Sequence, residues 1–321
     1  MSNWEPGASI KVLHERSTLL QKIRKYFSDQ DILEVDTPSI SKFPTIDEHI
    51  DSIEVYLKSQ KTPSYLISSP EYHMKRLLCF GMPSIYQICK AFRKDELGNY
   101  HNPEFTMIEW YQLGIDDYQL MQATDKLLQH VLNTAPAEFI TYKALFLKYL
   151  NIDPFNLTQS KFLLCCQESG LTPSKDLMIK NCRIEDQLNF LMGFYIEKKI
   201  GHQKPVFVYH YPANQSALAK IDPMHNQVSQ RFEVFYKGLE LGNGYHELQD
   251  YQVHLSRFES TIKKRKDSDQ TDYQIDYNFM DALKHGLPHC SGIAIGFDRL
   301  LMIKTGIEDI DKVQSFSSKR S

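Results

Sequence analysis

The sequence predicts an α+β fold in which an antiparallel β-sheet is flanked by helices. Residues 13–30 carry apolar side chains at helical spacing between charged ones, which indicates an amphipathic helix. Strand-like runs at 85–93 and 104–111 are separated by a polar stretch with Gly98 and Pro103, which is typical of a hairpin with a long loop. This segregation of helical and strand-rich stretches favours the α+β class.

The rest of the chain continues the same segregation. Leu, Met, Phe and Lys at mixed spacing, with breaks at prolines, predict a helical insertion at about 115–203. Aromatic and β-branched residues then become frequent and predict strands through 231–247. A charged helix at 250–266 and a strand–helix unit at 291–304 complete the predicted elements.

Composition excludes several classes of protein. The 321 residues include 37 basic and 40 acidic side chains, so the net charge is −3. The chain as a whole is therefore not attracted electrostatically to nucleic acid. The sequence has no apolar run of the roughly 18 residues that a membrane span needs. Its beginning lacks the basic and apolar segments of a secretory signal. We therefore expect no membrane association and a cytoplasmic protein.

Two further features of the sequence could indicate binding sites. The six cysteines lack the spacing of zinc ligands, so we expect buried, reduced thiols. The basic run from Lys263 to Lys266 could be a nucleic-acid patch, but we interpret it as the solvated end of a helix.

Glycine loops that bind phosphate are missing from the sequence. Neither G-x-x-x-x-G-K-[ST] nor a G-x-G-x-x-G pattern after a strand occurs, which excludes P-loop and Rossmann nucleotide sites. Arginines and carboxylates on strands offer another way to hold a triphosphate with its magnesium ion.

The predicted strand at 104–111 places chemically distinct side chains on one face. Alternation along a strand puts Phe105, Glu109 and Tyr111 together, opposite Trp110. That face could stack a planar base on the ring and hold a cation with the carboxylate and the phenol. An edge strand with solvated polar residues explains the pattern equally well.

A second hairpin is predicted within 231–247. If Lys237-Gly238 is a two-residue turn, residue 240 pairs with residue 235, and residue 242 pairs with residue 233. Glu233 and Glu240 then share a face as diagonal neighbours, roughly 7–8 Å apart, and could converge on one divalent cation. Two exposed glutamates are the alternative interpretation.

The segment from Ser291 to Leu300 has the pattern of a small-residue strand that enters a helix. Gly292 and Gly296 would let a ligand lie against the backbone, and Arg299 near the helix start would add a charge for phosphate. Asp298 and Arg299 could equally form a surface ion pair.

Together, these pieces resemble the class II aminoacyl-tRNA synthetases. The helix and strand that end at Pro38 look like motif 1, Phe92 through Tyr111 like motif 2, and Gly292 through Arg299 like motif 3. The stretches most similar to lysyl-tRNA synthetase are 69–76, 101–107 and 242–244. The resemblance implies the class II catalytic fold, as a single catalytic domain over residues 1–321.

The resemblance is closest to shortened paralogues of lysyl-tRNA synthetase that attach (R)-β-lysine to a lysine of elongation factor P. Few residues precede the first helix, so we expect no anticodon-binding domain. Ala294 is similar to the alanine that these ligases carry where lysyl-tRNA synthetases have glycine. The resemblance therefore implies ATP, Mg²⁺, lysine or β-lysine, and elongation factor P as cofactors and partners, and a homodimer through the motif 1 helix.

The resemblance also implies roles for individual residues. The amino acid would be bound by Ser69, Pro70, Glu71, Glu109, Tyr111, Glu247 and Ala294. ATP would be bound by Arg93, Lys94, Asp95, Asn102, Phe105, Glu240, Leu241, Gly296 and Arg299. Arg93 and Arg299 would act in catalysis, and Glu233 and Glu240 would carry magnesium. Asp95 departs from the family, which has glutamate at this position of motif 2.

The implied reaction is attack of the amino-acid carboxylate on the α-phosphorus of ATP, followed by transfer to the protein acceptor. Such chemistry depends mainly on positioning and charge neutralisation. Two alternatives stay open: a lysine-activating enzyme that charges a tRNA, and a non-catalytic synthetase-like regulator. The absence of an anticodon domain and the acidic net charge make tRNA the poorer acceptor.

Overall fold

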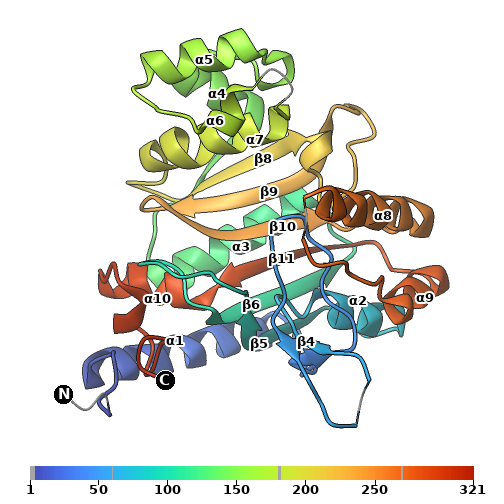
Figure 1. Cartoon of the computed structure of the whole chain (residues 1–321). Coiled ribbons are helices and arrows are strands. Elements are labelled where there is room, and N and C mark those ends of the chain that lie inside the picture. Colours follow the sequence, from blue (N-terminus) through green and yellow to red (C-terminus); the bar gives the residue numbers. More distant parts are fainter. Residues whose placement is uncertain (1–3, 60, 180–181, 269) are drawn as a thin grey trace. The chain divides into compact units, whose positions relative to one another are not determined.

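The computed structural model describes most of the chain, namely residues 4–59, 61–179, 182–268 and 270–321. Their contacts group into two compact units. Unit 1 combines the two ends of the chain, up to Asp116 and from Leu248 onward, and unit 2 comprises Asp117–Glu247. Figure 1 shows the helices and strands of both units. The single catalytic domain expected from the sequence stays a prediction.

Unit 1 is built on four strands in the order β1-β5-β6-β11. Only β1 runs parallel to its neighbour, and the other pairs are antiparallel. The strands are β1 (Leu33–Glu34), β5 (Ile85–Phe92), β6 (Glu104–Leu113) and β11 (Cys290–Gly296). The long-looped hairpin predicted from two strand-like runs is confirmed by the β5–β6 pair. A small second sheet holds β2 (Ile40–Ser41), β4 (Ser64–Leu66) and β3 (Glu54–Val55).

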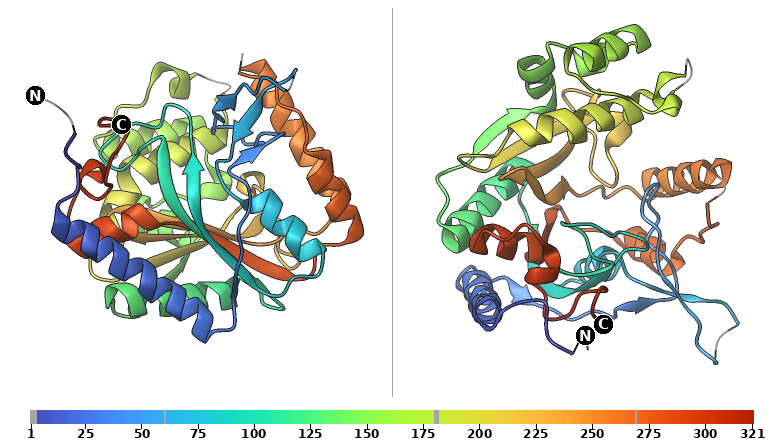
Figure 2. Two further views of the ribbon diagram at one scale, coloured as in Figure 1. Left: turned by 90° about the horizontal axis from the view of Figure 1, so that it is seen from below. Right: turned by 60° about the vertical axis from the view of Figure 1, so that its left-hand side comes forward.

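Helices flank the strands of unit 1. They are α1 (Ile10–Asp29), α2 (Glu71–Cys79), α8 (Tyr251–Asp267), α9 (Tyr277–His285), α10 (Phe297–Thr305) and the 3-10 turn η5 (Ile310–Lys312). Ser9 caps the start of helix α1, since its hydroxyl accepts a hydrogen bond from the Val12 N–H. Its Phe27 ring stacks on Tyr86 with centroids 4.3 Å apart, so α1 covers one face of β5 and β6 (Figure 2). Burial of such a ring stabilises the fold by roughly 1.5–3 kcal/mol.

Unit 2 is also built on four strands, in the order β10-β9-β8-β7. They are β7 (Glu138–Thr141), β8 (Val206–Pro212), β9 (Val228–Tyr236) and β10 (Leu239–His246), and only the β7–β8 pair is parallel. The helices are α3 (Asp117–Leu132), α4 (Tyr142–Leu150), α5 (Gln159–Glu168), α6 (Lys175–Met178) and α7 (Ile184–Leu191). Short turns are η1 (Pro154–Asn156), η2 (Met192–Ile196), η3 (Glu197–Lys199) and η4 (Ala213–Gln215).

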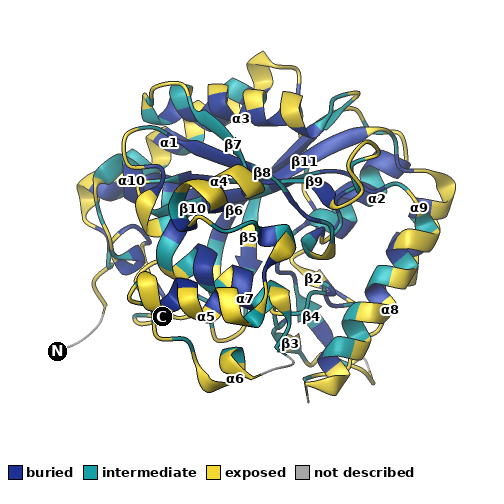
Figure 3. Ribbon diagram, turned by 90° about the horizontal axis from the view of Figure 1, so that it is seen from above, coloured by how far each residue is buried: buried dark blue, intermediate teal, exposed yellow. Residues whose placement is uncertain are grey.

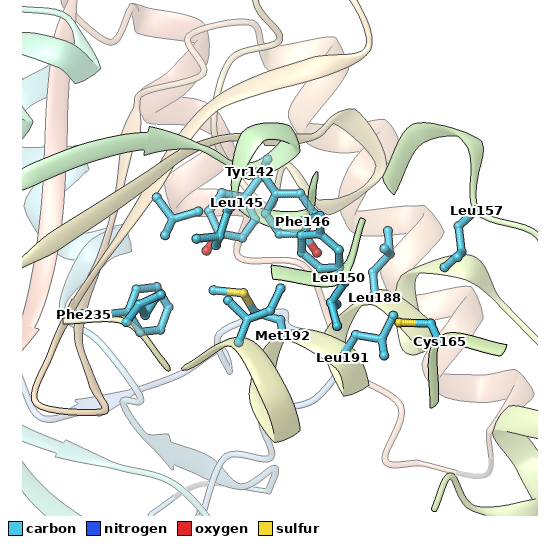
Figure 4. Close-up of a cluster of buried hydrophobic side chains, with 14 of the residues drawn as sticks. Tyr142, Leu145, Phe146, Leu150, Leu157, Cys165, Leu188, Leu191, Met192 and Phe235 are labelled. Atoms are coloured by element: carbon cyan, nitrogen blue, oxygen red, sulfur yellow. The ribbon is translucent and has the colours of Figure 1, made fainter. Parts of the chain in front are cut away.

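The helices of unit 2 bury a common apolar core. Phe146 of α4 and Leu191 of α7 are fully buried in one cluster with Phe235 of β9 (Figure 4). Phe162 of α5 belongs to the same cluster and is also fully buried. Large side chains from separate helices interdigitate here, so each helix depends on its neighbours for burial. The helical character predicted for 115–203 is thus present, although this stretch also contains the strand β7. That strand forms because Phe139 stacks on Phe207 of β8, with centroids 5.1 Å apart.

The C-terminal half of α8 differs from its predicted environment. Most of this helix is exposed or half-buried (Figure 3). Arg265, however, is only 1% exposed. Its guanidinium donates to Asp51 at 2.6 Å and lies 4.0 Å from the centre of the Tyr273 ring. The interpretation of this basic run as wholly solvated is therefore wrong at Arg265, because a carboxylate and an aromatic ring from other segments pack against it.

The six cysteines all lie within the described residues and are free thiols. Four of them are buried, as expected, whereas Cys89 and Cys182 are half-buried. Within the part of the chain that the structure describes, the helices are too short or too polar to cross a membrane.

Candidate active site

Strand β6 carries the candidate site of unit 1 on one of its two faces. Thr106 and Trp110 point toward α1, where Arg16 donates to the Thr106 hydroxyl at 2.7 Å. On the other face, the Tyr111 hydroxyl donates to Glu109 at 2.6 Å. The alternation predicted for this strand is confirmed.

Five side chains form what we call the acidic cluster: Ser69, Glu71, Lys75, Glu109 and Tyr111. The Ser69 hydroxyl donates to one oxygen of Glu109 at 2.6 Å, and the Tyr111 hydroxyl donates to the other. Lys75, with an exposed fraction of 0%, donates to Glu71 at 2.5 Å. Two carboxylates and one ammonium give the cluster a net charge of −1 when both carboxylates are ionised.

The ionisation of Glu109 reflects this environment. Burial and the neighbouring charge of Glu71 raise its pKa to about 7, although hydrogen bonds from Ser69 and Tyr111 and the charge of Lys75 act in the opposite direction. Such a group is about half ionised at neutral pH. An ammonium group bound beside it would favour the ionised form, so the cluster suits a positively charged ligand.

Neighbouring elements fix the position of the acidic cluster. Ala294 of β11 lies directly opposite Glu109 in the β6–β11 pairing, and Gln87 of β5 lies opposite it on the other side. The methyl group of Ala294 therefore borders the face that carries Glu109. Glu71 and Lys75 are one helical turn apart on α2. Pro70 holds the position before the first residue of α2.

The opposite face of α2 lines a different feature. His73, Arg76, Leu77 and Phe80 recur at helical spacing and border a pocket of about 740 Å³, together with Pro38. Glu71 and Lys75 do not line this pocket. Helix α2 thus separates the acidic cluster from the pocket.

The loop between β5 and β6 carries four of the nine residues expected to bind ATP: Arg93, Lys94, Asp95 and Asn102. The Arg93 guanidinium lies 5.1 Å from the centre of the Phe105 ring and 3.6 Å from the Glu96 carboxylate. Its buried Nε has no hydrogen-bond partner among the described residues. A buried donor without a partner costs free energy, so an oxygen of an anionic ligand would be favoured there.

Backbone hydrogen bonds anchor this loop. The Arg93 N–H donates to Pro103 O at 2.9 Å, and the Lys94 N–H donates to Asp51 O at 3.0 Å. Asp95 has a φ of 60°, in the left-handed region. Aspartate adopts this conformation more readily than most residues, which gives a local reason for the shorter acid in motif 2.

Arg299 lies in the first turn of α10, and its guanidinium contacts His101 Nε2 at 2.8 Å. Asp298 is buried and accepts hydrogen bonds from Arg16 at 2.6 Å and from the Thr106 N–H at 2.7 Å. The alternative of a surface ion pair between Asp298 and Arg299 is therefore wrong, because both side chains have other partners. A Cβ at Gly296 would meet only the Arg299 side chain at an ordinary 3.6 Å, so folding alone does not require glycine there.

The β9–β10 hairpin in unit 2 confirms part of the predicted pairing. Lys237 and Gly238 both have positive φ, at 52° and 73°, as a type I′ turn requires. Glu240 lies opposite Phe235 as predicted. The predicted pairing of residue 233 with residue 242 is wrong, because an irregularity at Leu241 shifts the register and places Asn243 opposite Glu233.

Glu233 is held by two side chains within unit 2. Arg231 donates to one of its oxygens at 2.5 Å, and the Tyr211 hydroxyl donates to the other at 2.6 Å. Burial raises the pKa of Glu233, the charge of Arg231 opposes this effect, and the charge of Glu240 adds to it. The carboxylates of Glu233 and Glu240 therefore interact, as their shared face predicts.

Glu233 and Glu240 fit a magnesium ion whose coordination is completed by phosphate oxygens. Across the described residues, no group of three or more His, Cys, Asp or Glu side chains is arranged to hold a metal by itself. Mg²⁺ is usually held by one or two carboxylates plus substrate phosphates, and each carboxylate can accept more than two bonds. The repulsion of Glu240 on Glu233 would be relieved by such a cation. Glu247, another expected ligand-binding residue of unit 2, is 1% exposed.

The structure also brings residues to these sites that sequence reasoning did not assign. Lys75 is the only ammonium group of the acidic cluster, and Arg231 and Tyr211 hold Glu233. Two of them could have been found from spacing, since Lys75 follows Glu71 by four residues on a helix and Arg231 precedes Glu233 by two on a strand. Tyr211 lies on another strand, and its sequence position gives no such indication.

Comparisons with known proteins agree with this architecture. The chain is 43% identical to the elongation factor P–(R)-β-lysine ligase of Buchnera aphidicola subsp. Schizaphis graminum, over 99% of both chains. It is 42% identical to the protein of the same name from Vibrio atlanticus, over 100% of this chain and 99% of the relative. The model of the class II tRNA synthetases (D, K and N) matches residues 6–320. The chain therefore belongs to the class II tRNA synthetase family.

Proposed function

We propose that this protein activates (R)-β-lysine with ATP and transfers it to a lysine side chain of elongation factor P. The similarity over nearly the whole length to proteins named as ligases of this kind carries the proposal. The acidic cluster supports it, because its charge of −1 complements the charge of +1 on β-lysine, which has two ammonium groups and one carboxylate.

In the first step, a carboxylate oxygen of β-lysine attacks the α-phosphorus of ATP, and pyrophosphate leaves. Glu71 binds the amino group nearer the carboxylate, and Glu109 with Tyr111 binds the distal ammonium group. Arg93 contacts the α-phosphate and the substrate carboxylate, since its planar guanidinium suits bidentate binding of anions. Arg299 binds the outer phosphates. The protein supplies positioning and positive charge rather than a nucleophile.

In the second step, the neutral ε-amine of the acceptor lysine attacks the acyl carbon of the adenylate. An amide bond forms, the bond to the phosphate oxygen breaks, and AMP leaves. The amine loses its proton to solvent or to a base in this step.

The remaining assignments concern unit 2 and the adenosine. Asn102 and Phe105 hold the adenosine, and Asp95 lies on the adenine side. Lys94 and Leu241 offer backbone contacts. Glu233 and Glu240 hold Mg²⁺, which neutralises phosphate charge when it is bound. Glu247 is the residue of unit 2 that we assign to the distal ammonium group.

The proposal includes a homodimer through the motif 1 region and a cytoplasmic location. Three large apolar side chains near this region support the dimer, because Leu33, Ile40 and Phe80 are 48%, 42% and 85% exposed. Sedimentation of the protein at micromolar concentration tests whether it is a homodimer.

One experiment separates the proposed function from its alternatives. The protein is incubated with ATP, Mg²⁺ and either α- or β-lysine, then with purified elongation factor P or tRNA, and the intact mass of the acceptor is measured. We expect elongation factor P to gain one β-lysyl group. Charged tRNA with unmodified factor would favour the tRNA-charging alternative. Absence of pyrophosphate release with any amino acid would favour the non-catalytic one.

A further inference from the structure

The C-terminal segment 310–320, which we call the C-terminal strap, lies against the loop that carries the expected ATP ligands. Ser318 donates to the Asn102 side-chain oxygen twice, from its N–H at 3.1 Å and from its hydroxyl at 2.7 Å. The Asn102 amide nitrogen donates to Glu104 O at 2.6 Å. The buried Asn102 side chain is thus bonded at both ends to the protein.

Two other residues of the strap hold the same loop. The Ile310 N–H donates to Asn99 O at 2.8 Å, and the Gln314 side chain donates to Glu104 O at 3.2 Å. The strap therefore contacts the loop at residues 99, 102 and 104. These bonds span the part of the loop that immediately precedes Phe105.

The strap is itself fixed to the body of unit 1. Gln314 also donates to the buried Asp298 at 3.2 Å, next to Arg299. The N–H groups of Gly7 and Ala8 donate to Ser315 O at 2.8 Å and Gln314 O at 3.1 Å.

An ion pair between Arg320 and Asp311 holds the two ends of the strap together. Arg320 donates to both oxygens of Asp311, at 3.1 and 3.0 Å, and the Ser317 hydroxyl donates to the same carboxylate at 2.5 Å. Ser318 follows Ser317 directly, so this closure fixes the backbone from which Ser318 reaches Asn102.

We propose that Ser318 is a positioning residue of the ATP site: it orients Asn102 and, with the rest of the strap, holds residues 99–104 in the conformation that receives the nucleotide. The Asn102 side chain is then set before ATP binds, and less conformational entropy is lost on binding. The inference rests on the proposed function, because that proposal identifies the loop as the ATP site.

Binding of Mg·ATP by calorimetry tests this inference without requiring turnover. Ser318→Ala removes the hydroxyl that makes the 2.7 Å bond and should raise the dissociation constant for ATP about fivefold, as expected for one neutral hydrogen bond. Ser318→Thr keeps a hydroxyl and should restore binding. Ser315→Ala is the matched control, because Ser315 is exposed and bonds through its backbone oxygen.

Steady-state kinetics separate positioning from a general structural role. The Michaelis constant for ATP should rise in Ser318→Ala, while that for β-lysine and the melting temperature stay at the wild-type values. Unchanged ATP affinity in Ser318→Ala, or an equal rise in both Michaelis constants with a lower melting temperature, would overturn the inference. A wild-type protein that binds ATP but activates no amino acid would refute the proposed function instead, and one that does not bind ATP would refute both.

Discussion

The acidic cluster and the loop at 93–103 are both assigned to substrate binding, yet they are built in different ways. In the cluster, Glu109 and Lys75 are 2% and 0% exposed, and side chains hold one another. Much of the loop is exposed, including Lys94 and His101, and backbone bonds and the C-terminal strap hold it.

This difference matches the charge of the two ligands. A single ammonium group gains little from a carboxylate in water, but the attraction strengthens where water is excluded. A triphosphate carries several negative charges, so guanidinium groups can bind it near the surface. The acidic cluster should therefore respond to a change of charge or pH, and the loop to loss of donor groups.

The largest expected effect concerns the loop. Arg93→Ala should lower kcat/KM for amino-acid activation about a thousandfold, because it removes the donors aimed at the charge that develops on the α-phosphate. Pyrophosphate exchange measures it. Arg183→Ala is the control, since Arg183 is a partly exposed arginine paired with Asp186, and it should retain full activity. A loss of less than tenfold at position 93 would place this guanidinium outside the reaction.

A smaller effect is expected in the acidic cluster. Glu109→Gln should raise the Michaelis constant for β-lysine about a hundredfold, because a buried partner of the substrate ammonium group is lost. Glu104 lies on the same strand and makes an exposed ion pair with Lys90. Glu104→Gln should therefore leave the Michaelis constant for β-lysine unchanged. If both variants behaved alike, the assignment of the ammonium site to the cluster would be wrong.

The cluster also predicts a pH dependence. The ionised form of Glu109 binds the ammonium group, and its pKa is about 7 in the free protein, so kcat/KM for β-lysine should fall about tenfold per pH unit below 7 and level off above it. Lys75 lowers this pKa, and Lys75→Met should therefore move the acid limb to higher pH. Lys284→Met removes an exposed lysine that is paired with Asp281 on its own helix, and it should leave the profile unchanged.

The same ionisation acts on stability with the opposite sign. Folding raises the pKa of Glu109 from 4.5 to about 7, so the folded state binds more protons than the unfolded state between these values. The contribution of Glu109 to the free energy of unfolding is therefore fully present below pH 4.5 and is lost as the pH rises to 7. Melting temperatures measured across this range should fall less steeply in Glu109→Gln than in the wild type.

The smallest expected effect concerns the shape of the amino-acid site. Ala294 lies opposite Glu109, so Ala294→Gly removes a methyl group beside the cluster and should shift the preference from β-lysine toward α-lysine about tenfold. The ratio of the two kcat/KM values in pyrophosphate exchange measures it, and each substrate serves as the control for the other. An unchanged ratio would show that this methyl group does not select the substrate.

Local patterns in the sequence determined many of the helices and strands, and which side chains share a face of a strand. The β5–β6 hairpin, the turn at Lys237-Gly238 and the common face of Glu109 and Tyr111 follow from periodicity and turn chemistry, which act within a few residues. The match to the class II synthetase family extends over residues 6–320 and therefore includes these segments.

Only the tertiary structure decided which groups are buried and what they contact. Lys75 is buried and forms an ion pair with Glu71. Ser318 donates a hydrogen bond to Asn102, which lies 216 residues earlier in the chain. The irregularity at Leu241 shifted a register that the turn alone had set. Periodicity specifies the face of an element but not what packs against it, because burial and long-range partners depend on how separate elements fill space together.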